Sequence, residues 1–226
     1  MAVVSILLDD QPREAAFTKL IMAGYTGRNQ EEAQAHIDEL KAHGIPAPDR
    51  IPTLYACAPA LLTTEAEISV VGHDTSGEAE FVLLPSDGEL LVGVGSDHTD
   101  RALEATDIPR AKQLCAKPMS SEVWRLAELI DHWDELLLRS WVGEDGAETL
   151  YQEGPLARLL PPEAILSTVM ANTTEPITGA IVFSGTLPII GGQFVPAPLF
   201  RVQLSDPIRG RSLECDYRVQ VMNYLR

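Results

Sequence analysis

Short apolar or alternating runs, separated by polar turns, follow one another along most of the chain. Runs of roughly four to eight such residues, bounded by Gly, Pro, Asn or Asp, are typical of β-strands. On this pattern we predict strands over Ala2–Leu8, Glu67–Val71, Glu78–Leu84, Leu90–Gly95, Leu136–Val142, Glu148–Gln152, Ala180–Ser184, Phe200–Leu204 and Arg218–Val221, with a further apolar run over Phe17–Ala23.

Fewer segments carry a helical pattern. One helix is predicted to begin after Asn29, a good N-cap with Glu32 three residues later as in a capping box, and to end before Gly44. We also predict helices over Ser121–Trp133 and Pro161–Met170, and a loop over Ala47–Pro59.

No stretch has the composition of a linker, so we expect one domain over residues 1–226. The predicted fold class is α+β, mainly β, with a few peripheral helices and with residues 1–50 forming a strand–helix segment packed on the β core. Hydrophobic residues make up 45% of the chain and charged residues 22%, which is typical of a packed globular protein and excludes a disordered one.

Charge narrows the possible partners. The chain has 17 Lys+Arg against 33 Asp+Glu, a formal net charge of −16, which disfavours nucleic acid and anionic lipid as partners.

No run approaches the roughly 18 apolar residues of a membrane helix, and no basic residue precedes the apolar start as in a signal peptide. The three cysteines are far apart without CxxC spacing. We therefore expect a cytoplasmic protein with reduced thiols and no membrane association.

Glu78 and Glu80 lie two residues apart in a predicted strand, so their carboxylates project to the same side. Like charges at this spacing repel unless a cation lies between them, and Mg²⁺ and Mn²⁺ favour carboxylate oxygens. The plain alternative is a solvated strand face. The apolar residues that follow, Phe81–Leu84, favour a strand that is buried on both sides.

The segment Gly95–Arg101 follows another apolar strand and places Asp97, His98 and Asp100 at its end. A third carboxylate at this position would complete a metal site with Glu78 and Glu80. The alternative is that these acids form the N-cap of a short helix that begins near Thr99.

Other candidates are individually weak. His36 and Glu39 lie one helical turn apart, as a general base and its orienting carboxylate would, or as an exposed pair. Lys112 alone is an ordinary surface charge. The small-residue turn Phe183–Pro188 offers hydroxyl and backbone N–H groups that would hold a carboxylate, or it is a plain turn.

Taken in order, these motifs resemble the fumarylacetoacetate hydrolase superfamily, and within it an uncharacterised bacterial branch, a domain of unknown function. The matching segments are Gly27-Arg28-Asn29, His36–Glu39, Glu78–Glu80, Asp97–Arg101, Lys112, Gln152–Gly154 and Ser184–Pro188. They span residues 27 to 188 in the order typical of the family. Asn29 and His36 are seven residues apart, about one helical turn more than in many members, and Lys117 is an alternative to Lys112.

The resemblance implies a mixed β-roll or β-sandwich fold, a homodimer, and a small-molecule 2-oxo acid or 1,3-dicarbonyl substrate. It also implies a divalent cation, Mg²⁺ or Mn²⁺, with Ca²⁺ as a further alternative. The implied site residues are Glu78, Glu80 and Asp97 as metal ligands, His36, Glu39 and Lys112 as catalytic residues, and Arg28, Arg101, Gly185 and Thr186 as substrate-binding residues.

The reaction that the resemblance implies is metal-dependent hydrolysis of a carbon–carbon bond in an acylpyruvate-like substrate, through an enolate. Decarboxylation, isomerisation and hydration use the same chemistry and stay open as alternatives. Hydrolysis requires a base that activates water, so it depends on His36. A non-catalytic binding protein with the same fold is a further alternative, which the retained carboxylates and Lys112 oppose, because an unused buried acidic cluster costs stability.

Overall fold

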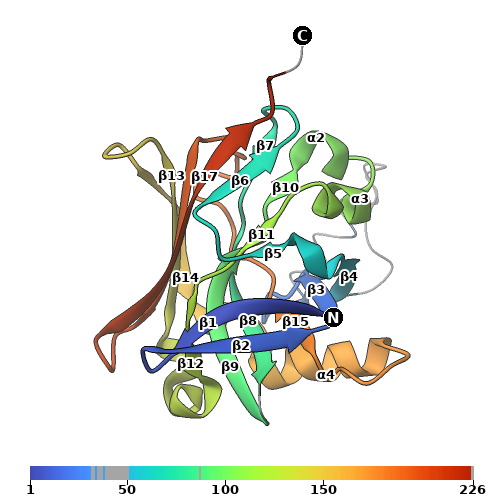
Figure 1. The fold of residues 1–226 in the computed structure, drawn as a ribbon, viewed down its shortest axis with the longest axis vertical. Coiled ribbons are helices and arrows are strands. Elements are labelled where there is room, and N and C mark those ends of the chain that lie inside the picture. The colour runs from blue at the N-terminus through green and yellow to red at the C-terminus, as the bar shows by residue number, and fades with distance from the viewer. Residues whose placement is uncertain (32–33, 35–37, 39–50, 87, 225–226) are drawn as a thin grey trace.

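The computed structural model describes residues 1–31, 34, 38, 51–86 and 88–224. Its largest element is an eight-stranded mixed sheet with the order β2-β1-β12-β9-β8-β15-β3-β4 (Figure 1). The strands of this sheet are β1 (Ala2–Leu8), β2 (Gln11–Phe17), β3 (Lys19–Gly24), β4 (Thr53–Cys57), β8 (Ala79–Ser86), β9 (Glu89–Ser96), β12 (Glu122–Arg125) and β15 (Ala180–Phe183).

A five-stranded sheet with the order β14-β13-β16-β17-β6 packs against the first. Its strands are β6 (Glu67–Val70), β13 (Leu137–Gly143), β14 (Thr149–Pro155), β16 (Leu199–Asp206) and β17 (Arg211–Val221). Two short pairs join β5 (Leu62–Thr63) to β11 (Lys117–Pro118) and β7 (Thr75–Ser76) to β10 (Thr99–Asp100). The described helices are α2 (Arg101–Glu104), α3 (Ile108–Gln113), α4 (Pro162–Asn172), η1 (Pro59–Leu61), η2 (Leu126–Glu128), η3 (Ile130–Glu135) and η4 (Leu156–Arg158).

Strand β8 contributes to two hydrophobic cores. Phe81 and Leu83 pack into the core between the two sheets, whereas Val82 and Leu84 pack into a second core on the other face of the eight-stranded sheet. That sheet curls, so that β2 contacts β8 across the second core. All four side chains are at most 1% exposed, which confirms the prediction of a strand buried on both sides.

The mainly β, α+β fold class is confirmed, but the predicted helix over Ser121–Trp133 is wrong. Its first part is the strand β12, which pairs with β1 on one side and β9 on the other, and its second part forms η2 and η3. Val123 and Trp124 enter different cores, as alternate residues of a strand do. Hydrogen bonding to two neighbouring strands and burial on both faces outweigh the local helical pattern.

Strands β2 and β4 were not predicted. β2 follows β1 through a two-residue turn in which Asp9 and Asp10 have φ values of 54° and 60°, typical of a tight β-hairpin. β4 lies inside Ala47–Pro59, so the prediction of a loop there is wrong for Thr53–Cys57. The helix predicted after Asn29 falls largely outside the described residues.

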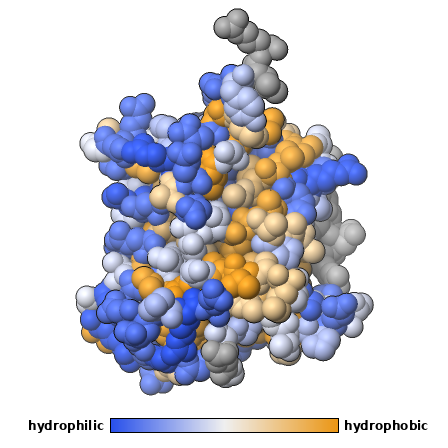
Figure 2. Space-filling view, viewed as in Figure 1, coloured by the Kyte–Doolittle hydropathy of each residue, from blue (hydrophilic) through white to orange (hydrophobic). Residues whose placement is uncertain are grey.

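Polar side chains flank a central apolar strip on the face shown in Figure 2. In the described part of the chain, no helix combines the length and hydrophobicity that a membrane crossing requires. The three cysteines are buried free thiols. Among the described residues, only Glu80, Asp97 and Asp206 are buried acidic side chains. Asp206 is paired with His132 and Arg211, whereas the other two belong to one cluster at the start of β8 and the end of β9.

Candidate functional site

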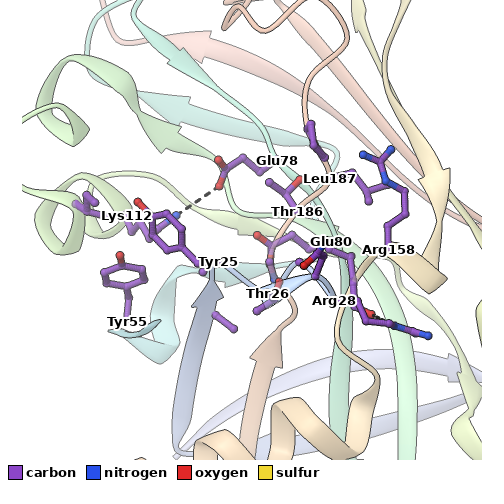
Figure 3. Close-up of a pocket in the computed structure, with 18 of the residues that line it drawn as sticks. Tyr25, Thr26, Arg28, Tyr55, Glu78, Glu80, Lys112, Arg158, Thr186 and Leu187 are labelled. Atoms are coloured by element: carbon purple, nitrogen blue, oxygen red, sulfur yellow. Dashed lines mark hydrogen bonds and ion pairs between the residues drawn. The ribbon is translucent and has the colours of Figure 1, made fainter. Parts of the chain in front are cut away.

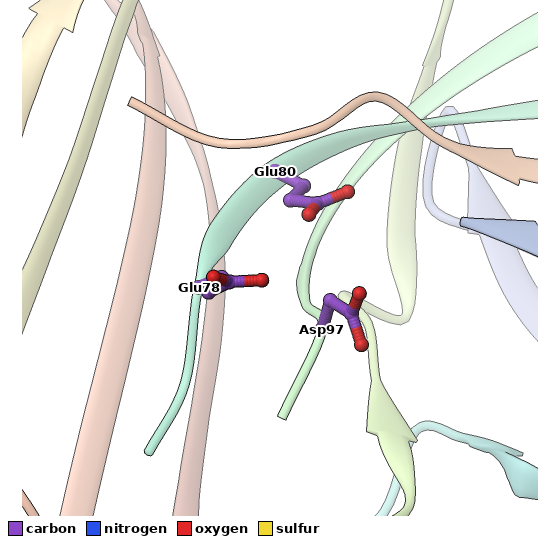
Figure 4. Close-up of side chains that lie close together, drawn as sticks. All are labelled: Glu78, Glu80 and Asp97. Atoms are coloured by element: carbon purple, nitrogen blue, oxygen red, sulfur yellow. The ribbon is translucent and has the colours of Figure 1, made fainter. Parts of the chain in front are cut away.

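Three carboxylates converge where β8 begins and β9 ends. Glu78 directly precedes β8, Glu80 pairs with Gly95 of β9, and Asp97 follows the last residue of β9. One ligand atom from each carboxylate lies within 4.8 Å of the others. Figure 4 shows Glu78 and Glu80 projecting from the same side of the strand towards Asp97. The antiparallel pairing of β8 with β9 therefore brings together the carboxylates of two separate motifs.

The carboxyl groups of Glu80 and Asp97 differ in acidity although each side chain is only 1% exposed. Burial and the charges of Asp97 and Glu78 raise the pKa of Glu80 well above its usual value. Burial alone would also raise the pKa of Asp97, but the charges of Lys112 and Lys117 outweigh it and hold that pKa below its usual range. Glu80 has no basic partner among the ion pairs of the described residues, so it is the carboxyl that most needs a cation.

Two lysines contact Asp97. Lys112 Nζ lies 2.5 Å from Asp97 Oδ2 and 3.4 Å from Glu78 Oε2. Lys117 Nζ lies 2.8 Å from Asp97 Oδ1 and donates to the carbonyl oxygen of His98 at 2.6 Å. Helix α3, which begins at the N-cap Asp107, carries Lys112, and strand β11 carries Lys117. Both of the lysines that the sequence left open as alternatives therefore reach the cluster.

Arg101 lies behind Glu78. Its Nε donates to Ser76 Oγ at 2.7 Å, and its Nη1 contacts Glu78 Oε1 at 3.2 Å and Glu104 Oε2 at 2.6 Å. The ring of Phe194 covers the guanidinium at 4.0 Å. Burial opposes the charge, but the two glutamates raise the pKa of Arg101, which stays ionised. These contacts orient Glu78, and the predicted role of Arg101 in substrate binding stays a prediction.

A cavity of about 960 Å³ opens onto the cluster and is lined by Glu78, Glu80 and Lys112. Figure 3 shows Lys112 with Tyr25 and Tyr55 on one side of this cavity and Arg28 with Arg158 on the other. The carboxylates lie between the two groups. A cavity of this size accommodates a small organic acid in contact with Glu78, Glu80 and Lys112 at once.

The turn after β15 approaches Glu80 closely. The backbone N–H of Gly185 donates to Glu80 Oε2 at 2.8 Å, so the turn holds a carboxylate of the protein itself. Gly185 has φ +85°, and a Cβ atom there would lie 2.2 Å from Thr26 Oγ1, so only glycine fits. The hydroxyl of Thr186 donates to the carbonyl oxygen of Ala79 at 2.9 Å.

Gln152 fixes this turn to β8. Its Oε1 accepts hydrogen bonds from Ala79 N at 3.0 Å and Ser140 Oγ at 2.9 Å. Its Nε2 donates to Thr186 Oγ1 at 2.7 Å and to the carbonyl oxygen of Leu187 at 2.6 Å. The side chain is fully buried. Gln152, the first residue of the Gln152–Gly154 motif, therefore holds the Thr186–Leu187 segment against the start of β8.

Two arginines stand at the rim of the cavity. Both Nη atoms of Arg28 bind the carboxylate of Asp134, at 2.6 and 2.7 Å, and its Nε donates to the carbonyl oxygen of Leu159 at 3.0 Å. Arg158 is exposed and has no ion pair or side-chain hydrogen bond within the described ranges. Arg158 is therefore available to a ligand at the rim, and the predicted role of Arg28 in substrate binding stays a prediction.

Of the three candidates in Gly95–Arg101, only Asp97 joins the cluster. His98 is buried, with its Nδ1 2.9 Å from the Tyr217 hydroxyl and its Nε2 2.9 Å from Thr75 Oγ1. Burial and the charge of Lys117 lower the pKa of His98 to about 3, so its ring is neutral. Asp100 is the N-cap of α2, which agrees with the alternative interpretation of this segment.

Two predicted catalytic residues cannot be compared with the structure, and two tyrosines line the cavity without having been predicted. His36 and Glu39 lie outside the described residues, so their pairing stays a prediction. Tyr25 and Tyr55 line the cavity but were not predicted as site residues. Tyr25 has φ +57°, which no sequence pattern indicates, and Tyr55 lies in the segment predicted to be a loop.

The donor set fits a hard divalent cation. Three carboxylates in or next to the ends of β8 and β9 offer oxygen ligands only, which is the chemistry that Mg²⁺, Mn²⁺ and Ca²⁺ prefer. The buried Glu80 without a basic partner supports the same conclusion, because a buried carboxyl is costly unless it is paired or coordinates a metal.

Comparison with known proteins identifies the family and the fold. A family model described as "Protein of unknown function (DUF2848)" matches residues 23–217. A search of curated sequences returned no significant match.

Three solved structures resemble the fold. 2-Keto-3-deoxyarabinonate dehydratase superposes with a TM-score of 0.67 at 16% identity, over 94% of this chain and 78% of that chain. A Yersinia pestis CO92 protein assigned to the fumarylacetoacetate hydrolase family has a TM-score of 0.60 at 17% identity, over 91% and 93%. 4-Oxalocrotonate decarboxylase from Pseudomonas putida G7, complexed with calcium and acetate, has a TM-score of 0.55 at 15% identity, over 92% and 78%. The predicted fumarylacetoacetate hydrolase-like fold is thus confirmed.

Proposed function

This chain belongs to the DUF2848 family, and from its site we propose that it is a divalent-metal-dependent enzyme acting on 2-oxo acids or 1,3-dicarbonyl compounds through an enolate. The observation that carries the proposal is the convergence of Glu78, Glu80 and Asp97 with Lys112 at one cavity. Similar folds support it: the dehydratase has a complex with magnesium and 2,5-dioxopentanoate, and the decarboxylase has one with calcium and acetate.

The residues divide into ligands and supports. Glu78, Glu80 and Asp97 would hold the cation, which supplies Lewis-acid polarisation of the substrate oxygens when bound. Lys112 lines the same cavity and would stabilise the negative charge that develops on the substrate. Arg101 orients Glu78, and the turn at Gly185 orients Glu80.

As the specific reaction we propose hydrolysis of a carbon–carbon bond in an acylpyruvate-like substrate, with His36 activating water and Glu39 orienting it. A second candidate is dehydration or decarboxylation of a 2-oxo acid. It is favoured by one observation: among the described residues that line the cavity there is no histidine. His36 is thus the residue on which the choice of reaction depends.

The experiment incubates the protein with a panel of substrates in the presence of Mg²⁺ or Mn²⁺ and monitors each reaction by proton NMR. The panel contains acylpyruvates, 3-deoxy-2-oxo sugar acids and 2-oxo diacids, which report hydrolysis, dehydration and decarboxylation separately. We expect turnover of one class by the wild type and loss of turnover in Glu80→Gln, with His36→Asn losing hydrolysis but retaining metal binding.

Glu65→Gln provides the matched control, because Glu65 is exposed and, within the part of the chain that the structure describes, its side chain has no hydrogen bond or ion pair; only its backbone N–H donates, to Thr63 Oγ1. Equal turnover by the wild type and Glu80→Gln would remove the carboxylate cluster from the mechanism. Undiminished hydrolysis in His36→Asn would remove His36 and leave another group as the base.

A further inference from the structure

Both oxygens of Asp97 are in contact with an ammonium group. Lys112 Nζ lies 2.5 Å from Oδ2, and Lys117 Nζ lies 2.8 Å from Oδ1. Asp97 therefore has no oxygen at which a cation could bind without a lysine as its immediate neighbour. Like charges at such distances repel strongly in a buried site.

The two lysines are held differently. Lys117 has no exposed surface, and its ammonium is fixed by the carbonyl oxygen of His98 at 2.6 Å as well as by Asp97. Lys112 lines the cavity, and its second contact, to Glu78 Oε2, is 3.4 Å long. Lys112 is thus the one that is free to move into the cavity.

The charges around the cluster are already close to balance. The carboxylates of Glu78, Glu80 and Asp97, with Glu104 beside them, face three cationic side chains. These cations are Lys112, Lys117 and Arg101. A divalent cation would leave this buried group with a net positive charge, which is unfavourable unless a cation leaves or an anion enters.

We propose that Lys112 is an exchangeable counter-cation: it gives up Asp97 and Glu78 when a divalent metal binds and passes to the anionic ligand in the cavity. Lys117 is the fixed counter-charge that orients Asp97. The proposal rests on the proposed function, because it takes the three carboxylates as the metal ligands. This exchange makes metal and anion binding cooperative. The bound metal frees Lys112 to contact the anion, and the bound anion offsets the positive charge that the metal adds.

The residues around Lys112 offer its ammonium group a second position, away from the carboxylates. Its Nζ lies 5.7 Å from the centroid of the Tyr55 ring, and Figure 3 shows Tyr25 beside it at the same side of the cavity. An aromatic face stabilises an ammonium by a cation–π contact. The ammonium can therefore move from the carboxylates towards a ligand without losing all of its favourable contacts.

The test measures Mn²⁺ binding by calorimetry, with and without oxalate as the anionic probe, in the wild type and in Lys112→Met. We expect Lys112→Met to bind Mn²⁺ alone about tenfold more tightly, because a neighbouring positive charge is removed. We also expect oxalate to tighten Mn²⁺ binding less in this variant than in the wild type, because the ammonium that would meet oxalate is gone.

Lys112→Arg keeps the charge and is expected to bind like the wild type. Arg110→Met is the matched control on the same helix, because the Arg110 side chain is 81% exposed and its one ion pair among the described residues is with Asp107. Lys112→Gln provides a second neutral variant, and thermal melting shows that each variant is folded.

The outcomes separate the two proposals. Mn²⁺ affinity that is unchanged or weaker in both neutral variants, or an undiminished effect of oxalate in them, overturns the role of Lys112. If the role of Lys112 is overturned in this way, the proposed metal site is still supported when the wild type binds Mn²⁺ and Glu80→Gln does not. A wild type that binds no Mn²⁺ overturns both proposals together.

Discussion

The backbone N–H of Gly185 donates a 2.8 Å hydrogen bond to Oε2 of Glu80, a residue 105 positions earlier in the chain. The bond joins the turn after β15 to the carboxylate on β8. Gly185 has φ +85°, and its Cα faces Thr26, so the contact depends on the absence of a side chain. The orientation of Glu80 thus depends on a backbone conformation that few other residues adopt.

Gly185→Ala is therefore expected to lower the free energy of unfolding by about 1–3 kcal/mol and to weaken Mn²⁺ binding. Urea denaturation and Mn²⁺ titration measure the two effects. Gly191→Ala is the control, because Gly191 has φ +81° but open space around its Cβ position. If both variants bind Mn²⁺ equally well, the turn does not position Glu80.

Mg²⁺ or Mn²⁺ is expected to raise the melting temperature, because a ligand that binds only the folded state stabilises it. At about 100 times Kd the gain is about 2.7 kcal/mol, or roughly 5–10 °C for a chain of this length. Glu80→Gln is expected to abolish the increase without loss of stability in chelator, because it removes a buried carboxyl that lies beside two others. Identical melting curves with metal and with chelator would contradict the metal site.

Metal affinity is expected to rise with pH. Below the raised pKa of Glu80 its carboxyl holds a proton, which a metal must displace; above that pKa the dependence ends. Asp97, whose pKa is lowered, is ionised throughout this window and adds no dependence. Mn²⁺ titrations at several pH values measure the slope, and calorimetry in two buffers measures the released proton. A Kd that does not change with pH would show that Glu80 is ionised before the metal binds.

Gln152→Leu is expected to destabilise the fold by about 2–4 kcal/mol, because the N–H of Ala79 and the carbonyl oxygen of Leu187 both lose a buried partner. Urea denaturation checks this. Gln203→Leu is the matched control, since among the described residues the side chain of Gln203 bonds only to exposed or partly buried side chains on its own sheet. A loss of similar size in the two variants would mean that the buried hydrogen bonds of Gln152 contribute nothing specific.

The sequence was sufficient to predict the features that depend on local periodicity. The extended backbone with a period of two from Glu78 into β8 places Glu78 and Glu80 on the same side, and the apolar residues after them indicate burial. Asp97 could be proposed because it follows the next strand of the chain, and β8 and β9 are joined as a hairpin. The fold class follows from the same alternation.

Features that depend on distant partners could not be predicted. The pairing of Arg28 with Asp134 spans 106 positions, and the cavity contains the side chain of Tyr55 from a segment without a clear period. The contact of both Lys112 and Lys117 with Asp97 could not be predicted, because it depends on where α3 packs and on the pairing of β11 with β5. The strand β12 replaces a predicted helix for the same reason: its partners lie far away in the sequence.

The two hydrophobic cores that share β8 have a consequence for how this protein would respond to laboratory evolution. Substitutions near Glu78 and Glu80 on that strand disturb one core or the other, so few of them will be tolerated. The rim of the cavity comes instead from a loop that carries Arg28 and from the short helix η4 that carries Arg158. A library confined to those rim positions is expected to change which acids are accepted while the metal requirement stays the same.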